Sequence, residues 1–144
     1  MAADRRLAVN ADQEITTARA KTSSGEVWVF FDDIHDVTNL SPHEEAGEAW
    51  EATVATERVG MAVVDTFPPN HTFVFRVAVL EPFRRMGVGT ALLTTLQEEY
   101  GRLACRVHEQ NDASRALVRS VGFQRVECRF HELEGYDTHE TDEA

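Results

Sequence analysis

A short glycine- and arginine-containing segment is the part of the chain best suited to chemistry. Residues 84–90 (RRMGVGT) follow the apolar run Phe73–Val79 and lead into the amphipathic stretch Val88–Tyr100. A strand that turns directly into a helix points backbone N–H groups and the positive end of the helix dipole at one spot. Gly87 and Gly89 have no Cβ, so an oxyanion can approach the main chain closely. The segment therefore predicts a phosphate-binding loop.

The spacing of this loop excludes two familiar phosphate-binding patterns. The Walker loop ends in Gly-Lys-Ser/Thr, and this segment has no lysine. The dinucleotide-binding loop needs a third glycine, where Leu92 stands. The pattern that fits is Arg-x-x-Gly-x-Gly, with Arg84, Gly87 and Gly89 at its fixed positions. An ordinary glycine-rich turn between strand and helix is the structural alternative.

A second patterned segment follows downstream. Residues Leu103–His108 alternate between apolar and polar, which is typical of a half-buried strand. Asn111 or Asp112 can then cap a helix, and apolar residues recur near helical spacing up to Val121. Gly122 stands where a left-handed residue would end that helix. The segment predicts a strand, a capped short helix and a Gly-Phe end.

Together the two segments resemble the acetyl-CoA motifs of the GCN5-related N-acetyltransferase (GNAT) family. In the second family motif, Gly-Phe follows the Asn as Gly122 and Phe123 follow Asn111, eleven and twelve residues later. The resemblance covers residues 73–130. It implies an α/β (α+β) fold, in which a mixed, mostly antiparallel sheet is splayed near its centre and has helices on both faces.

The resemblance also implies a reaction and the residues that bind its donor. The reaction is direct transfer of an acetyl group from the thioester of acetyl-CoA to a primary amine. The main chain of Val77 and Val79 would hold the pantetheine arm and polarise the carbonyl, while the loop amides and its arginines would hold the phosphates. The implied CoA-binding residues are Val77, Val79, Arg84, Arg85, Met86, Gly87, Val88, Gly89, Thr90, Asn111 and Ser114.

The acid and base of this reaction are less evident from the sequence. Glu51, Glu81 and His71 are candidate bases, and for each the competing interpretation is a solvated side chain. The family commonly has a Tyr seven residues after the Asn, which protonates the CoA thiolate. Val118 stands there. This departure leaves open a second function, a non-catalytic acyl-CoA-binding module that acts as a sensor or partner subunit.

Composition limits the classes of partner. The chain has 144 residues, with 25 Asp and Glu against 14 Lys and Arg, so its net charge is −11. Strong acidity argues against nucleic-acid and membrane partners, and it suits either a cationic amine substrate or a high-salt habitat. The histidines show no metal-ligand spacing, so no metal is expected. The sequence has no signal-peptide pattern, so we expect a cytoplasmic protein. We expect it to be a monomer or a homodimer.

The remaining elements are expected from local patterns. Residues 1–131 are expected to form one domain with an atypical N-terminal part, and the acidic residues 132–144 a disordered tail. Further expected elements are a hairpin of strands 15–20 and 26–31, a helix from Ser41 through Ala49, a hairpin of strands 50–55 and 59–64, and a closing strand 124–130.

Overall fold

A computed structural model describes residues 14–21, 27, 30, 47–67, 71–126 and 136–141. Strands and helices account for most of these residues. In chain order they are β1 (Ile15–Arg19), β2 (Glu48–Val54), β3 (Glu57–Phe67), β4 (His71–Val79), the short 3-10 helix η1 (Glu81–Phe83), α4 (Val88–Tyr100), β5 (Leu103–His108), α5 (Asp112–Ser120), β6 (Gln124–Val126) and β7 (Tyr136–Glu140).

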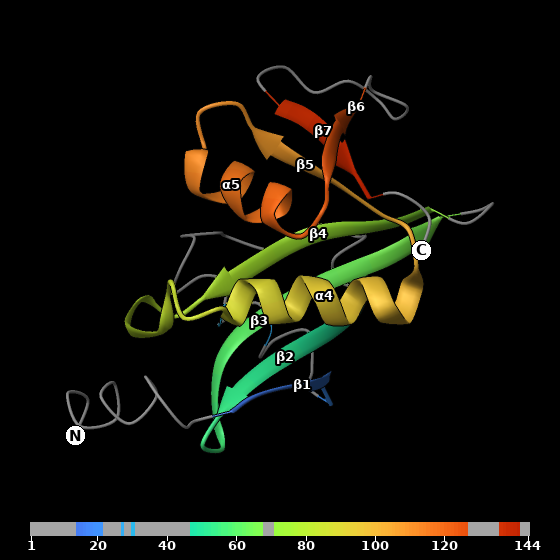
Figure 1. The fold of residues 1–144 in the computed structure, drawn as a ribbon. Coiled ribbons are helices and arrows are strands. Elements are labelled where there is room, and N and C mark those ends of the chain that lie inside the picture. The colour runs from blue at the N-terminus through green and yellow to red at the C-terminus, as the bar shows by residue number, and fades with distance from the viewer. Residues whose placement is uncertain are drawn as a thin grey trace.

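The strands of the described part form a single mixed sheet. Its order is β1-β2-β3-β4-β5-β7-β6, and every adjacent pair is antiparallel except β4 and β5. Those two parallel strands pair only from Thr72 with Leu103 to Val74 with Cys105. Beyond these pairs they move apart towards their C-terminal ends (Figure 1). The sheet is therefore splayed at its centre, as expected.

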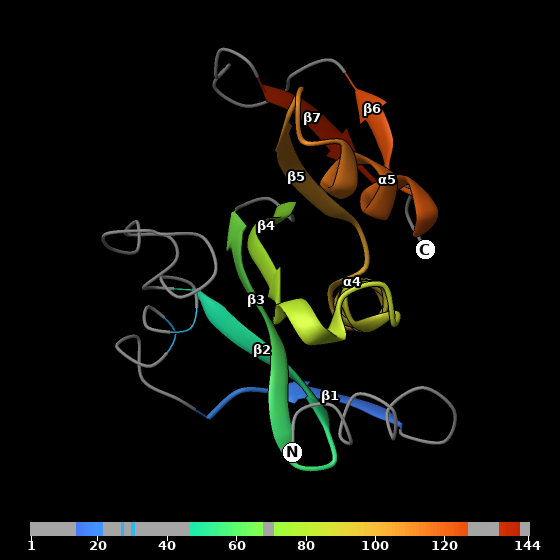
Figure 2. The same ribbon diagram turned by 90° about the vertical axis from the view of Figure 1, so that its left-hand side faces the viewer.

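The two described helices cover one face of this sheet (Figure 2). Alternating residues of β3 divide between two apolar clusters, because successive side chains of a strand point to opposite faces. Ala62 and Val64 pack in the main cluster beside α4. Met61 and Val63 pack in a smaller cluster with Val27, and Phe30 lies against that cluster. Val27 and Phe30 are helical, so helical residues contact both faces.

A β-bulge in β4 changes which residues face the helices. Val63 and Val64 of β3 are consecutive, yet they pair with Arg76 and Val74, so Phe75 is the extra residue of β4. Val74 therefore faces the same side as Val77 rather than the same side as Arg76. The bulge lies beside the end of the β4–β5 pairing, and it sets the orientation of the strand where the sheet opens.

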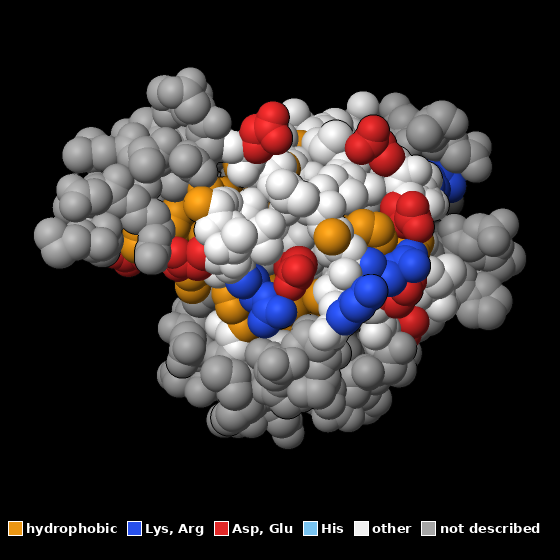
Figure 3. Space-filling model, turned by 90° about the horizontal axis from the view of Figure 1, so that it is seen from below, with side chains coloured by type: hydrophobic (Ala, Val, Ile, Leu, Met, Phe, Trp, Pro, Cys, Tyr) orange, Lys and Arg blue, Asp and Glu red, His pale blue; other side chains and the backbone are white. Residues whose placement is uncertain are grey.

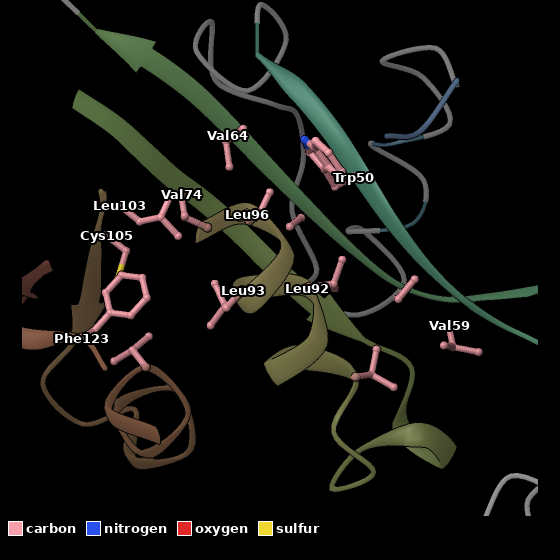
Figure 4. Packing of buried hydrophobic residues seen from close by; sticks show 14 of the residues in the cluster. Trp50, Val59, Val64, Val74, Leu92, Leu93, Leu96, Leu103, Cys105 and Phe123 are labelled. Atoms are coloured by element: carbon pink, nitrogen blue, oxygen red, sulfur yellow. The ribbon is translucent and has the colours of Figure 1, made fainter. Parts of the chain in front are cut away.

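The main core lies between α4 and the centre of the sheet. Leu92, Leu93 and Leu96 of α4 are buried at 2% exposure or less. Figure 4 shows these leucines on the side of the helix towards the strands that carry Val64 and Val74. Complete burial of a leucine side chain contributes about 1.5–3 kcal/mol. This packing fixes α4, and with it the loop that begins the helix.

The expectations for the central segments are confirmed. The strands Phe73–Val79 and Leu103–His108 and the helix Val88–Tyr100 are present, and β4 only begins two residues earlier than expected. The central hairpin is also present, with Ala55 and Thr56 at positive φ in its two-residue turn. These elements are specified by local periodicity and turn signals, which is why the sequence predicts them well.

The expected N-terminal hairpin is wrong. β1 pairs with β2, antiparallel from Ile15 with Val54 to Arg19 with Trp50. In the segment 26–31 only Val27 and Phe30 are described, and both are helical. Val27 and Phe30 pack on the sheet as helical residues, and a short apolar run has no alternation that would distinguish a buried helix from a buried strand.

The helix expected through Ala49 is wrong at its end, because β2 already begins at Glu48. Ala49 pairs with Val63 of β3. Residues 41–46, which carry the expected capping box, lie outside the described residues. Pairing along the whole of β3 overrides the local helix preference at this boundary.

The expectation of a disordered tail after residue 131 is wrong for residues 136–141. Tyr136–Glu140 forms β7, which is hydrogen-bonded to β5 on one side and β6 on the other. Thr141 follows, and its side-chain oxygen accepts a hydrogen bond from the backbone N–H of Leu103 at 2.8 Å. Pairing on both sides satisfies the backbone of a polar segment that shows no strand pattern of its own. The domain therefore extends past residue 131.

Charged side chains of both signs lie close together on the surface seen from below (Figure 3). Among the described ion pairs, Arg19 pairs with Glu48 at 2.9 Å and with Glu99 at 3.0 Å. Within the described ranges, no helix has both the length and the apolar character needed to span a bilayer. The same residues contain no group of three His, Cys, Asp or Glu side chains that could hold a metal ion.

Candidate functional site

The first turn of α4 exposes unbonded backbone donors. Gly87 is the N-cap residue, in the left-handed region at φ 88°, and no side chain caps the helix. The first hydrogen bond of the helix runs from the Ala91 N–H to the Gly87 carbonyl oxygen at 2.9 Å. The amides of Val88, Gly89 and Thr90 precede that bond, so the helix itself offers them no acceptor. Together with the helix dipole they favour an anion.

Two exposed arginines lie just before this turn. The Arg84 Nε donates a hydrogen bond to the Val79 carbonyl oxygen at 3.1 Å, which ties the loop to the end of β4. A guanidinium has further N–H donors, so Arg84 can still bind a phosphate. Arg85 has φ 65°, a left-handed conformation that costs a non-glycine residue about 1–2 kcal/mol. Backbone strain of this kind is typical of ligand-binding loops.

A groove of about 660 Å³ runs from this loop towards α5. Its size is within the range of roughly 300–1,000 Å³ that is usual for ligand sites. It brings together all the expected CoA-binding residues except Met86, which instead packs against the main core. The groove is lined by Val77, Ala78, Val79, Phe83, Arg84, Arg85, Gly87, Val88, Gly89, Thr90, Asn111, Ala113, Ser114, Ala116, Leu117 and Ser120.

Gly89 has a packing role that the sequence does not reveal. A Cβ atom built at Gly89 would lie 3.0 Å from the Leu117 Cδ2, which is too close unless the leucine shifts. The missing side chain therefore lets α5 approach α4. The close approach of an oxyanion to the main chain is better attributed to Gly87. A Cβ atom built there would have no atom nearer than 4.0 Å, but φ is 88°, a conformation that disfavours any residue with a side chain.

A second, smaller cavity of about 290 Å³ lies in the splay between β4 and β5. It shares Val77, Asn111, Ser114 and Leu117 with the groove, so the two spaces meet at these residues. The cavity is lined by Val74, Arg76, Val77, Leu93, Cys105, Arg106, Val107, His108, Asn111, Ser114, Leu117 and Val118. A molecule with phosphates at the loop can thus extend into the centre of the sheet.

Helix α5 closes one side of both spaces, and its start is capped. The Asn111 Oδ1 accepts a hydrogen bond from the Ser114 N–H at 3.1 Å. This bond uses the side-chain oxygen and leaves the Asn111 amide nitrogen to donate to a ligand. Ala113, Ala116, Leu117 and Ser120 also line the groove but were missed, although their spacing of three and four residues marks one helix face.

Two of the three candidate bases, Glu51 and Glu81, line neither cavity. The Glu51 carboxylate accepts from the Arg58 Nε at 2.9 Å. Glu81 is exposed in η1. His71 begins β4, where that strand still pairs with β3, at the end away from the splay. The described structure therefore does not bring Glu51 and Glu81 together with the residues expected to bind CoA. The side chain of His71 lies outside the described part, and the catalytic role of all three stays a prediction.

His108 and Cys105 do line the splay cavity. The His108 Nδ1 accepts a hydrogen bond from the Gln110 N–H at 3.1 Å, so a neutral His108 carries its proton on Nε2 and donates from there. Burial raises the pKa of the Cys105 thiol to about 12, which keeps it protonated and unreactive near neutrality. Val118 is 5% exposed and adds only apolar surface. Among the described lining residues there is no carboxylate.

Comparison with known proteins places this geometry among acetyltransferases. The acetyltransferase (GNAT) family model matches residues 13–123. A curated relative, the N-alpha-acetyltransferase RimI of Mycobacterium tuberculosis, is 31% identical over 103 residues. That alignment covers 69% of this chain and 65% of the relative, slightly less than two thirds of its length.

Solved structures show the same fold at low sequence identity. A GNAT-family acetyltransferase from Bacillus cereus has a TM-score of 0.73 at 18% identity, covering 91% of this chain and 99% of its own. One from Elizabethkingia anophelis, with acetyl-CoA bound, has a TM-score of 0.69 at 17% identity, covering 91% and 98%. The ribosomal-protein-S18-alanine N-acetyltransferase of Escherichia coli has a TM-score of 0.65 at 19% identity, covering 88% and 91%.

Proposed function

Because this chain belongs to the acetyltransferase (GNAT) family, we propose that it transfers an acetyl group from acetyl-CoA directly to the nitrogen of a primary amine. The observation that carries the proposal is the junction of the loop groove with the splay cavity at Val77, Asn111, Ser114 and Leu117. A donor with phosphates at one end and a thioester at the other fits two connected spaces of this kind. The relative solved with acetyl-CoA bound supports the choice of donor.

The groove matches the chemistry of the CoA end of the donor. The N–H groups of Val88, Gly89 and Thr90 would donate to the pyrophosphate, and the Arg84 and Arg85 guanidiniums would offset its charge. Arg84 is already oriented by its bond to the Val79 carbonyl. That bond engages the Val79 carbonyl, so Val77 is the better of the two residues to hold the pantetheine arm.

The transfer step needs few groups from the protein. The amine lone pair attacks the thioester carbonyl carbon, a C–N bond forms, and the C–S bond breaks with its electron pair going to sulfur. The proton lost from nitrogen passes to water, and the CoA thiolate takes one from solvent. The main contribution of the protein is then to hold the two reactants in line.

A second candidate is a module that binds acyl-CoA without turning it over. Two observations favour it: Val118 has no proton to donate, and the described lining of the splay cavity contains no carboxylate. We rank it second because water can carry both protons, and because the cavity extends beyond the groove to where an acceptor would meet the thioester.

We place the reaction in the cytoplasm, with no nucleic-acid or membrane partner. The net charge of −11 supports the expected absence of nucleic-acid and membrane partners, because polyanions and anionic membranes attract basic surfaces. The chain is proposed to work as a monomer or homodimer of one domain, which includes β7. The name of the curated relative supports an α-amine as acceptor.

The test is a thiol-release assay with acetyl-CoA against a panel of primary amines, beside calorimetry of CoA binding. Thiol release that depends on the amine is expected, with the acetylated amine confirmed by mass spectrometry. CoA binding with no release across the panel would favour the non-catalytic module. Failure to bind CoA would contradict both functions.

A further inference from the structure

The described lining of the splay cavity carries basic side chains, in a protein that is strongly acidic. Arg76, Arg106 and His108 contribute to it, and no Asp or Glu is among its described lining residues. The chain as a whole has 25 acidic residues against 14 basic ones. Arginines that line a cavity of so acidic a protein favour an acceptor that carries a negative charge.

These three residues lie on the face of the sheet away from α4 and α5. Val74 and Cys105 pair across the sheet and both face the main core, so Arg106 and His108, one and three positions after Cys105, face the other side. Arg76 pairs with Val63, which belongs to the cluster on that other face. The Arg106 guanidinium lies 5.6 Å from the centre of the Phe73 ring, which confirms its direction.

The cavity is therefore lined by residues of both faces of the sheet, and these residues differ in character between the two faces. Leu93, Leu117 and Val118 line it from the helix side, where it joins the CoA groove. Arg76, Arg106 and His108 line it from the opposite side. An acceptor has to reach the thioester from the side that the donor does not occupy, so it meets the basic residues first.

Carboxylates do occur on this face, but they lie outside the cavity. Asp65 pairs with Phe73, Glu140 pairs with Ala104, and Glu51 pairs with Met61. None of the three is among the lining residues. Among the described lining residues, the permanently charged side chains are therefore the two arginines, Arg76 and Arg106.

The guanidinium groups of Arg76 and Arg106 would have two effects on an acceptor amine in the cavity. They disfavour its ammonium form, since like charges destabilise each other, and so they help to deliver the neutral nucleophile. They also repel an acceptor that carries further positive charges and attract one that carries a carboxylate. An α-amine suits this site better than a lysine side chain, because its ordinary pKa is lower, about 8 against about 10.4.

We propose that the acceptor is an α-amine with a carboxylate close to it, and that Arg76 and Arg106 bind this carboxylate while His108 donates to it from Nε2. The proposal rests on the proposed acetyltransferase function. The carboxylate has two possible sources: the α-carboxylate of a free amino acid, or an acidic side chain at the second position of a peptide.

The experiment compares acceptors that differ only in charge. Acetyl transfer is measured for peptides that begin Ala-Asp, Ala-Asn and Ala-Lys and are otherwise identical, and for free alanine against alaninamide. A kcat/KM at least tenfold higher, about 1.4 kcal/mol, for Ala-Asp than for Ala-Asn indicates a peptide acceptor. The same preference for alanine over alaninamide indicates a free amino acid.

Variants then assign the preference to the arginines. Arg76→Gln and Arg106→Gln are expected to raise KM for the preferred acceptor at least tenfold, with little change in kcat and little change for the uncharged acceptor. Arg106→Lys keeps the charge and should restore most of the preference. Arg119→Gln is the matched control, since Arg119 is exposed on α5 and lines neither cavity.

The outcomes separate this inference from the function on which it rests. Equal rates for the acidic, neutral and basic acceptors of both sets would overturn the inference and leave acetyl transfer intact. So would a preference that survives in both glutamine variants. No thiol release with any of the acceptors, in a protein that binds CoA, would overturn the proposed function and the inference with it. If a glutamine variant has a markedly lower melting temperature than the wild type, the test is Arg106→Lys alone. Retention of the acceptor preference in Arg106→Lys supports the proposal, and loss of that preference counts against it.

Discussion

The two ends of helix α4 are built in opposite ways. At its N-terminus no side chain caps the helix, no acidic residue lies in the first turn, and Gly87 takes a left-handed conformation. At its C-terminus Tyr100 donates a hydrogen bond to Glu48 at 2.5 Å and accepts one from the Trp50 Nε1 at 3.0 Å. Arg19 links Glu48 to Glu99 beside it.

This difference separates binding from stability along one element. A side-chain cap at the N-terminus would stabilise the helix by about 1 kcal/mol, and α5 has such a cap in Asn111. α4 has no such cap, so the backbone amides of its first turn stay available to a ligand. The hydrogen-bonded C-terminus and the buried leucines hold the helix in place instead. We therefore expect changes at one end to alter CoA affinity and changes at the other to alter stability.

The largest effect is expected for Thr90→Asp at the open end. A carboxylate in the first turn interacts favourably with the helix dipole, by about 0.3–1 kcal/mol, but it repels the CoA phosphates. CoA affinity should fall at least a hundredfold, about 2.7 kcal/mol, while the melting temperature stays level or rises. Calorimetry measures the first and thermal unfolding the second.

Thr94→Asp is the matched control for that change. Thr94 is exposed, one turn further along α4, and lines neither space. It should leave CoA affinity within about twofold, a difference of about 0.4 kcal/mol. Equal losses in the two variants would mean that the groove does not hold phosphates at the start of α4.

The next largest effect is expected for Tyr100→Phe at the closed end. The variant loses the hydroxyl that joins Glu48 and Trp50, and the unfolding free energy should fall by about 1–2 kcal/mol. CoA affinity should not change, since Tyr100 lines neither cavity. Denaturant unfolding measures the change in stability, and calorimetry measures CoA affinity. A marked loss of CoA affinity would contradict the view that the C-terminal end of α4 serves stability and not binding.

A smaller effect is expected for Arg85→Gly. Glycine removes the cost of the left-handed conformation, about 1–2 kcal/mol, although its greater freedom in the unfolded chain offsets part of this gain. CoA affinity should fall severalfold with the lost charge. Arg85→Asn, which tolerates this conformation and lacks the charge, should match the affinity loss. Unchanged stability in Arg85→Gly would mean that the loop is not strained.

The smallest effect is expected in the pH dependence of stability. Burial, followed by the hydrogen bond to Glu48, raises the pKa of Tyr100 above its ordinary value of 10.0. The folded protein then keeps a proton that the unfolded chain loses, so this contribution is present below pH 10.0 and is lost as the pH rises beyond it. Unfolding free energies on either side of that pH should therefore fall more steeply in the wild type than in Tyr100→Phe. Parallel pH profiles would rule out the shift.

The sequence predicts the elements around the loop almost to the residue. α4 and β5 have the expected bounds, and Asn111 caps α5 while Gly122 follows it at φ 97°. Caps, glycine turns and apolar periodicity act over a few residues, so a single chain carries them completely. The expected CoA-binding residues depend on the same local signals, and all but Met86 meet in one groove.

Strand pairing was not predictable in the same way. β1 pairs with β2, and the polar segment Tyr136–Glu140 pairs between β5 and β6. Partners this far apart in the chain are selected by the shape of the whole sheet and by the backbone hydrogen bonds it can satisfy. Glu51 and Glu81 do not line the cavities for a related reason, because residue type alone does not give the direction or the depth of a side chain.

The sequence by itself determined the open start of α4, since a strand, an arginine pair and two glycines before an amphipathic helix leave unbonded amides wherever they fold. Only the tertiary structure decided what those amides face. Gly89 accommodates Leu117, so α5 lies against α4 and forms the groove. Across the bulge at Phe75, Arg76 faces the side of the sheet opposite to Val74, where it lines the splay cavity together with Arg106 and His108. A strand's face reverses with a single inserted residue, and that insertion exists only in relation to the neighbouring strand.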